Sequence, residues 1–163
     1  MGTKAVTTPA QGRADLAKRL LVLGGVSLAI AFGTDRVVLA HGESVPVTVF
    51  WKLPRSMPVK GDYVMLEVEH PIVGPRPTRL TKQLVCDTGD LLQLRDDAFW
   101  CNGVRLGGFI TRTWDDKPLT PFAYDGKIPE GQAFVMGSHP RSFDSRYFGL
   151  VDKSRLVRLA GLV

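Results

Sequence analysis

The sequence predicts a mainly β fold that follows an N-terminal apolar segment, and three observations support this. Glycine and proline are frequent, with 17 and 11 in a chain of 163 residues, which indicates many turns rather than a helical bundle. Beyond Gly42, short apolar stretches follow the two-residue period of strands. Before it, Leu20 to Phe32 is an uncharged apolar run. The length suits one domain plus such a segment, since a domain usually takes about 100–200 residues.

The apolar run has three possible interpretations: a single-pass anchor, a cleaved signal peptide or a buried core helix. It is shorter than the roughly 20 residues of a membrane span, although Val37 to Ala40 could extend it. Ala29 to Ala31 resembles a signal-peptide cleavage site. Lys18 and Arg19 precede the run, which favours export with the basic end left in the cytoplasm. We therefore expect a cytoplasmic tail at residues 1–19, a membrane anchor or signal segment at 20–40 and a periplasmic β-rich domain at 41–163.

The formal net charge of +5 does not indicate a nucleic-acid partner. A nucleic-acid-binding domain gathers its basic residues on one face, usually within a recognisable motif. Here the basic residues are spread along the chain, and part of the excess lies before the apolar run.

Strand signals recur throughout the exported part. β-branched and aromatic residues alternate with polar ones, and Gly-Asp or Asp-Asp pairs separate the stretches. Asn102-Gly103 indicates a two-residue hairpin turn, and Pro71–Pro77 and Thr113–Pro129 read as loops. The predicted strands are Val47–Trp51, Tyr63–Glu69, Leu80–Val85, Leu91–Leu94, Ala98–Cys101, Ala133–Met136 and one within Leu150–Leu159.

The two cysteines, Cys86 and Cys101, flank a short candidate hairpin. In an exported domain a disulfide between them would persist, and the alternative is a pair of buried thiols. Two cysteines without nearby histidines do not complete a zinc site, so we predict no metal and no cofactor.

Histidine-based catalysis is one alternative for the chemistry. The chain has His41, His70 and His139, and a Ser–His–Asp triad could use His139 with Asp144. The sequence lacks the Gly-x-Ser-x-Gly turn of many such sites, and a Cys86–His site would need a free thiolate.

Four stretches in a fixed order after the apolar run carry a more specific signal. They are Glu43–Pro46, Lys60–Val64, Lys82–Asp90 and Gly137–Gly149. Each is weak alone, because a serine before a proline and a Gly-Asp pair are common in turns. The last is the most distinctive, since it contains Ser-Phe-Asp-Ser-Arg-Tyr-Phe-Gly at residues 142–149.

These four stretches resemble the conserved boxes of the type I signal peptidases, most closely the TraF-type branch of conjugative-transfer systems. The resemblance implies a signal-peptidase-like β fold held at the bacterial inner membrane. It assigns Ser44 as the nucleophile, Lys82 as the general base and Ser142 as the hydroxyl that orients the lysine. It also assigns Asp144 and Arg146 as a pair that braces the site. It implies a leader-bearing protein substrate, such as a pilin, and no cofactor.

The chain departs from the family pattern at several positions. Ser138 and His139 stand where the family has Asp and Asn, and Thr88 replaces a proline. Some relatives use a serine hydroxyl at the position of Gly42 to hold the oxyanion, and the Ser44 N–H remains as a donor here.

The implied mechanism needs a neutral lysine, since Lys82 must accept the serine proton. Burial among apolar neighbours such as Leu80, Leu84 and Val85 would lower its pKa. A substrate would bind as an added strand, and shallow apolar pockets would accept small residues before the cut. We also expect Val45, Val47, Phe50 and Trp51 to meet the membrane surface. Two alternatives stay open: transpeptidation that cyclises a pilin through the same acyl-enzyme, and a non-catalytic exported scaffold.

Overall fold

The structure is a computed structural model that describes residues 36–40, 45–46 and 49–162. The apolar run at 20–32, Gly42 and Ser44 lie outside these residues, as do His41 and Val47. In the described part, no helix is long and apolar enough to cross a membrane.

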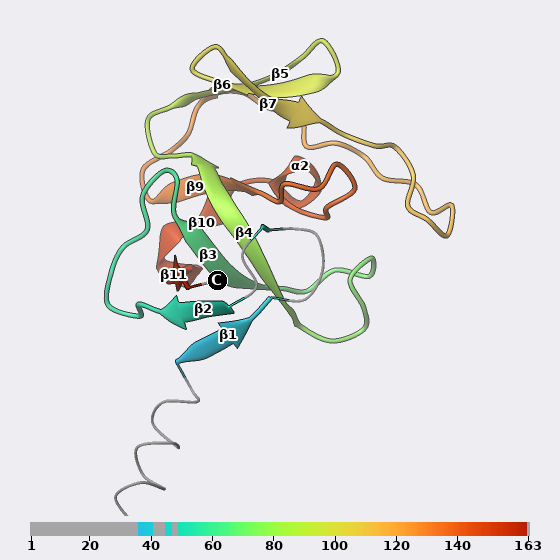
Figure 1. The fold of residues 1–163 in the computed structure, drawn as a ribbon. Coiled ribbons are helices and arrows are strands. Elements are labelled where there is room, and N and C mark those ends of the chain that lie inside the picture. The colour runs from blue at the N-terminus through green and yellow to red at the C-terminus, as the bar shows by residue number, and fades with distance from the viewer. Residues whose placement is uncertain (1–35, 41–44, 47–48, 163) are drawn as a thin grey trace, which may run out of the picture. The chain divides into compact units, whose positions relative to one another are not determined.

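Two sheets make up the described β fold, so the prediction of a mainly β chain is confirmed (Figure 1). The larger has the order β1-β2-β11-β3-β4-β9-β10 and the smaller the order β7-β6-β5-β8. The strands are β1 (Val37–Leu39), β2 (Val49–Lys52), β3 (Tyr63–Val68), β4 (Thr78–Cys86), β5 (Leu91–Arg95), β6 (Ala98–Cys101), β7 (Val104–Gly108), β8 (Asp125–Lys127), β9 (Gln132–Met136), β10 (Val151–Asp152) and β11 (Val157–Gly161). The helices are α2 (Ser145–Phe148) and the 3-10 turn η1 (Lys153–Arg155).

Strand β4 is paired differently along its two halves. Along its length from Thr78 to Gln83 it pairs antiparallel with β3. On its other edge it pairs with β9 only from Gln83 to Cys86. Among the described residues, no strand covers that edge of β4 from Thr78 to Thr81.

The apolar core divides between the two faces of the β4–β9 pair. Leu84 and Val135 belong to one buried cluster, whereas Cys86 and Phe134 belong to another, which packs under the smaller sheet. In β9 the division follows from alternation, since Phe134 and Val135 are neighbours in the chain. In β4 it follows from the irregular pairing between Leu84 and Cys86, because a bulge there shifts Cys86 to the other face. Each fully buried Leu or Phe contributes about 1.5–3 kcal/mol, so the two clusters fix β4 from both faces.

The predicted strands in β3, β4, β5, β6 and β9 are found with small shifts at their ends. The turn between β6 and β7 is the predicted hairpin, with φ of 50° at Asn102 and 79° at Gly103. Both angles are positive, as a tight two-residue hairpin turn requires.

The structure departs from the expected secondary structure in three segments. Thr113–Pro129 is not all loop, because β8 lies within it and pairs with β5. The expected strand in Leu150–Leu159 is split by η1, where the Asp152 carboxylate accepts the Ser154 N–H at 2.8 Å and starts a turn. Val37–Leu39 do not continue the apolar run as a span but form an edge strand, in keeping with their β-branched side chains.

The expectation that Val45 and Phe50 meet the membrane surface was wrong, whereas Val47 lies outside the described residues. Phe50 is fully buried and Val45 is 7% exposed. Both pack with Leu159 of β11, since these apolar side chains close a third small cluster rather than face outward. Trp51 is half-buried.

Candidate active site

Lys82 lies in the middle of β4 and is only 2% exposed. It is opposite Val64 of β3, next to the point where β9 begins to pair with β4. Its Nζ donates a hydrogen bond to the Ser142 hydroxyl, which comes from the loop before α2. The structure thus brings together two of the predicted site residues, 60 positions apart in the chain.

Burial lowers the pKa of Lys82 from 10.5 to about 8. The negative charge of Asp144 opposes this change, and the positive charge of Arg146 adds to it. Of the expected apolar neighbours, Leu80 shares a cavity with Lys82 and Leu84 is fully buried. Val85 packs instead against the cluster around Cys86, because it points to the other face of β4.

Asp144 and Arg146 form a buried ion pair beside this site, as the resemblance led us to expect. Arg146 Nε donates to one carboxylate oxygen and Nη2 to the other, both at 2.8 Å. Asp144 also caps α2 and accepts the N–H of Gly137 at 2.9 Å. Burial works against the charge of Arg146, but the hydrogen bonds and charge of Asp144 outweigh it and raise the pKa of Arg146.

The same guanidinium holds the loop that carries Ser142. Arg146 donates to the carbonyls of Pro140 at 3.1 Å, and of His139 and Ser142 at 3.2 Å each. It also donates to the Gly108 carbonyl at the end of β7, at 2.8 Å. A planar group with five donors can satisfy several carbonyls at once, so Arg146 fixes the backbone on which Ser142 sits.

The alternative triad through Asp144 finds no support in the described residues. Both oxygens of the Asp144 carboxylate accept hydrogen bonds from Arg146, and one also accepts the Gly137 N–H. His139 lines the cavity with Lys82, and its Nδ1 accepts the backbone N–H of Arg141 at 3.2 Å.

The second and third sequence boxes hold the end of β4 in place. Gly61, with φ of 96°, donates its N–H to the Leu84 carbonyl, and Leu84 donates back to the Asp62 carbonyl. The Asp62 carboxylate pairs with Arg158 of β11 at 2.8 Å. Asp90 accepts from Lys60 at 3.0 Å, which ties the two boxes together.

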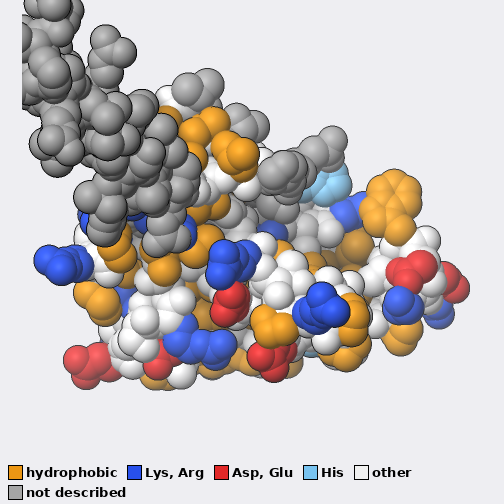
Figure 2. All heavy atoms as spheres, turned by 90° about the horizontal axis from the view of Figure 1, so that it is seen from below, with side chains coloured by type: hydrophobic (Ala, Val, Ile, Leu, Met, Phe, Trp, Pro, Cys, Tyr) orange, Lys and Arg blue, Asp and Glu red, His pale blue; other side chains and the backbone are white. Residues whose placement is uncertain are grey.

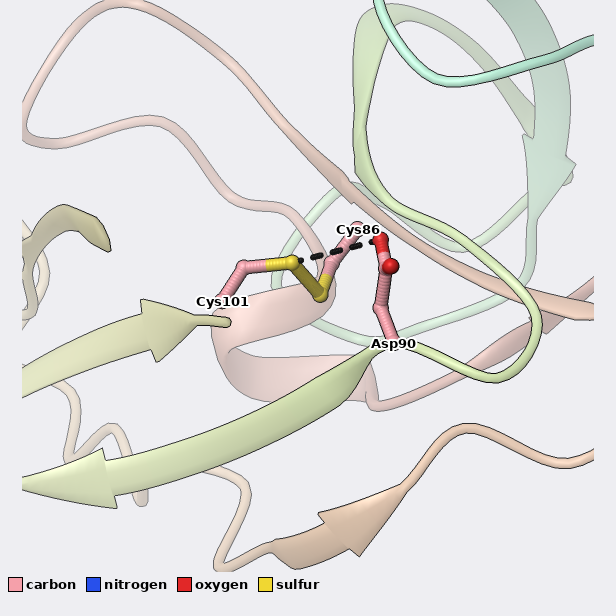
Figure 3. Close-up of side chains that lie close together, drawn as sticks. All are labelled: Cys86, Asp90 and Cys101. Atoms are coloured by element: carbon pink, nitrogen blue, oxygen red, sulfur yellow. Dashed lines mark hydrogen bonds between the residues drawn. A yellow bond between two sulfur atoms is a disulfide. The ribbon is translucent and has the colours of Figure 1, made fainter. Parts of the chain in front are cut away.

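A disulfide joins Cys86 to Cys101, as expected, and links β4 to β6 (Figure 3). The Asp90 carboxylate lies 3.4 Å from the Cys101 sulfur, so three potential metal ligands are close together. A disulfide sulfur is not the thiolate that binds metals, which leaves this cluster with one usable donor.

Sequence reasoning missed two residues at the site. Trp114 and Arg141 line the same cavity as Lys82 and Ser142, and the Arg141 guanidinium lies 4.1 Å from the centre of the Trp114 ring. The only signal in the sequence was a tryptophan within a polar loop, Thr111 to Lys117.

Comparison with known proteins identifies the family of this chain. Residues 39–163 match the family model described as signal peptidase, peptidase S26. The chain belongs to this family. The matched range includes Ser44, Lys82 and the Ser142–Gly149 box.

Two individual proteins illustrate the similarity. A signal peptidase I of Bacillus licheniformis is 30% identical over 106 residues, which are 60% of this chain and 54% of that protein. The chain therefore matches about half the length of this curated relative. A crystal structure of a signal peptidase I from Enterococcus faecalis V583 is 26% identical, covers 66% of this chain and 99% of that chain, and gives a TM-score of 0.38.

Proposed function

We propose that this member of the family is a serine–lysine endopeptidase that removes leader segments from exported proteins. Ser44 is the nucleophile and Lys82 the general base. The observation that carries the proposal is the buried Lys82 amine, whose pKa of about 8 leaves it substantially neutral at mildly alkaline pH. An exposed lysine with a pKa near 10.4 would be almost fully protonated there and unable to accept a proton.

In the proposed reaction, neutral Lys82 takes the hydroxyl proton of Ser44 as the serine oxygen attacks the scissile carbonyl. The resulting oxyanion accepts the Ser44 N–H. Protonated Lys82 then gives its proton to the leaving amine as the peptide bond breaks, and an ester to Ser44 remains. Lys82 then takes a proton from a water molecule as the water oxygen attacks the ester, and it gives this proton to the Ser44 oxygen as the ester bond breaks. Ser142 keeps the amine aimed during these transfers, since its hydroxyl accepts a hydrogen bond from Nζ.

The open edge of β4 supports the proposed binding of substrate as an added strand. In the described part, β4 has no strand partner on this edge from Thr78 to Thr81, and Lys82 is the next residue. An extended peptide pairing there would bring its backbone carbonyls close to the lysine. The adjoining cavity of about 260 Å³ is small, in keeping with small side chains near the cut.

We further propose that the protein resides in the bacterial inner membrane, with the apolar run at residues 20–32 as its anchor and the β domain in the periplasm. The basic residues before the apolar run and the Cys86–Cys101 disulfide support export to an oxidising compartment. The Ser142–Gly149 box supports the conjugative-transfer branch, for which a pilin precursor would be the substrate.

Replacement of the two reacting groups tests the proposal. Ser44→Ala and Lys82→Ala should each lower the cleavage rate of a leader-bearing precursor by about 1,000-fold or more, because each removes a group that acts in the bond-breaking step. Ser154→Ala and Lys127→Ala, at exposed positions, are matched controls and should cleave normally. Gel analysis of precursor and product, with circular dichroism to verify folding, measures this. Normal cleavage by either site variant would contradict the proposal.

The same assay separates the two alternatives. Cyclisation through the acyl-enzyme would give a product lighter than the linear cleaved chain by one water, which mass spectrometry resolves. A scaffold without catalysis would leave the precursor uncut by wild-type protein at every pH tested.

A further inference from the structure

Trp114 is an exposed aromatic residue in a well-defined position. Its side chain is 84% exposed, although tryptophan is usually largely buried. It lies on the segment between β7 and β8, and one face of its ring is covered by the Arg141 guanidinium. Figure 2 shows one face of the molecule, on which hydrophobic side chains lie at the surface among basic and acidic ones.

The loop that carries Trp114 is held by its own contacts. Arg112 and Pro118 form a β-bridge, and Thr113 exchanges backbone hydrogen bonds with Lys117 and Asp116. The two acidic residues of the loop are paired, Asp116 with Arg112 at 3.1 Å and Asp115 with Lys117 at 2.6 Å. The position of Trp114 is therefore set by the loop and by Arg141 together.

Strand β4 also contributes to the lining of this cavity. Leu80 and Lys82 point to one face of this strand, and they line the cavity with Ser142 and Phe143. The volume of about 260 Å³ is below the roughly 300–1,000 Å³ of sites for whole small molecules. It suits one or two side chains of an extended peptide that lies along β4.

We infer that Trp114, positioned by Arg141, is a specificity-determining residue that contacts a substrate side chain in the cavity that it shares with Leu80. This inference rests on the proposed peptidase function. The contact favours an apolar side chain, because Trp114 and Leu80 both contribute apolar surface to the cavity. It disfavours a lysine or arginine, since Arg141 also lines the cavity, while the acidic groups of the loop are already paired.

A second tryptophan provides a matched control. Trp100 on β6 has the same type of partner, with the Arg95 guanidinium 4.4 Å from its ring centre. It lies in the smaller sheet and does not line the cavity of Lys82. Any effect that is general to losing a stacked tryptophan should therefore appear in Trp100→Ala as well.

The test uses a set of synthetic peptides that span an Ala-x-Ala junction and vary one position at a time among Ala, Leu, Asp and Lys. Wild-type protein should prefer Leu to Lys at one position by about tenfold or more in kcat/KM, as expected for an aromatic hot spot. Trp114→Ala should lose this preference, Trp114→Phe should keep part of it, and Trp100→Ala should keep all of it. Arg141→Ala should raise the rate for the Lys peptide selectively.

The double variant Trp114→Ala/Arg141→Ala adds a readout that a purely structural role would not produce. The effects of the two changes should be non-additive at the selected position only, because Arg141 acts there partly by orienting the ring. An unchanged preference profile in Trp114→Ala, with normal cleavage by wild type, would overturn the inference and leave the peptidase proposal intact.

A binding measurement covers the case in which wild type cleaves no peptide. Fluorescence titration of a Trp51→Phe/Trp100→Phe double variant with the Leu and Lys peptides reports on Trp114, which is the tryptophan that remains of the three in the chain. A selective change with the Leu peptide, lost in Trp114→Phe, would support the contact even if the peptidase proposal fails. Equal or absent responses to the two peptides would overturn it.

Discussion

Two buried basic residues of this protein have pKa values shifted in opposite directions. Arg146 lies in helix α2 and Lys82 in strand β4, and each is 2% exposed. The pKa of Arg146 is raised, whereas the pKa of Lys82 is lowered to about 8. Burial acts against the charged form of both residues, and their partners account for the opposite directions.

The partners described for the two residues differ in charge. Arg146 meets both oxygens of the Asp144 carboxylate and several carbonyls, all of which favour its charged form. Lys82 donates to the neutral Ser142 hydroxyl, and the field of Asp144 only partly offsets the effect of burial. The bidentate carboxylate keeps Arg146 protonated, which suits a structural ion pair. Burial beside a neutral hydroxyl lets Lys82 lose its proton more easily.

Removing the charge of Asp144 should have the largest effect on stability, because it takes away the carboxylate that keeps Arg146 charged. Asp144→Asn leaves Arg146 buried without its anion and should lower the free energy of unfolding by about 3–5 kcal/mol. Urea denaturation without reductant measures the loss. Asp125→Asn, at an exposed position of β8, is the control and should change little. A loss as small as that of the control would mean that the carbonyl ligands alone hold Arg146.

The pH dependence of stability tests the other half of the comparison. Below pH 8, Lys82 is protonated in both the folded and the unfolded chain, and the folded state carries the cost of a buried charge. Between about pH 8 and 10.5 only the unfolded chain keeps the proton, so stability rises with pH. The full gain is about 3 kcal/mol, from the difference between the two pKa values.

Lys82→Met has no such group and serves as the reference. The difference between its free energy of unfolding and that of wild type should be larger at pH 7 than at pH 10, by up to about 3 kcal/mol. The variant is thus relatively more stable at pH 7. Denaturation at the two pH values gives the difference directly. A constant offset between the two proteins across this range would show that the pKa of Lys82 is not lowered.

Ser142→Ala should have a smaller effect that is visible in kinetics. Its hydroxyl stabilises the protonated amine by accepting a hydrogen bond, worth about 0.5–1.5 kcal/mol, so its removal should lower the pKa of Lys82 further. The acid limb of kcat/KM should move to lower pH by about 0.5–1 unit, while the plateau falls because the amine is held less well. Ser142→Thr keeps a hydroxyl, so the acid limb of its kcat/KM profile should lie at the wild-type pH. An acid limb at the wild-type pH in Ser142→Ala would contradict the proposed role of Ser142.

Local patterns in the sequence were enough for much of the fold. Alternation predicted β3 and β4, and Asn102-Gly103 predicted the turn after β6, because these features depend on residues close together in the chain. The short β8 was missed, since Asp-Gly-Lys has no strand propensity and forms a strand only by pairing with β5. Val45 and Phe50 were assigned to the surface because the sequence does not show that β11 returns beside them.

The site was predictable to a different extent. The contact of Lys82 with Ser142 and the pairing of Asp144 with Arg146 were expected from the resemblance, not from spacing. The hydrogen bonds of Arg146 to three carbonyls of the loop before α2 could not be predicted, because they depend on how the backbone of that loop folds back over the guanidinium. The Trp114–Arg141 contact joins two loops far apart in sequence, and no local pattern reports such a meeting.

The two sheets also differ in how far along the chain their contacts reach, which bears on the order of folding. The disulfide spans 15 positions and closes around the β5–β6 hairpin, whereas Lys82 and Ser142 are 60 positions apart. Short loops close faster than long ones, and contacts that are distant in sequence form late. We therefore expect the smaller sheet to form first and the lysine to be buried only when the C-terminal third of the chain has arrived. A partly folded chain would then keep its lysine protonated and inert, so catalytic competence would begin only with the finished fold.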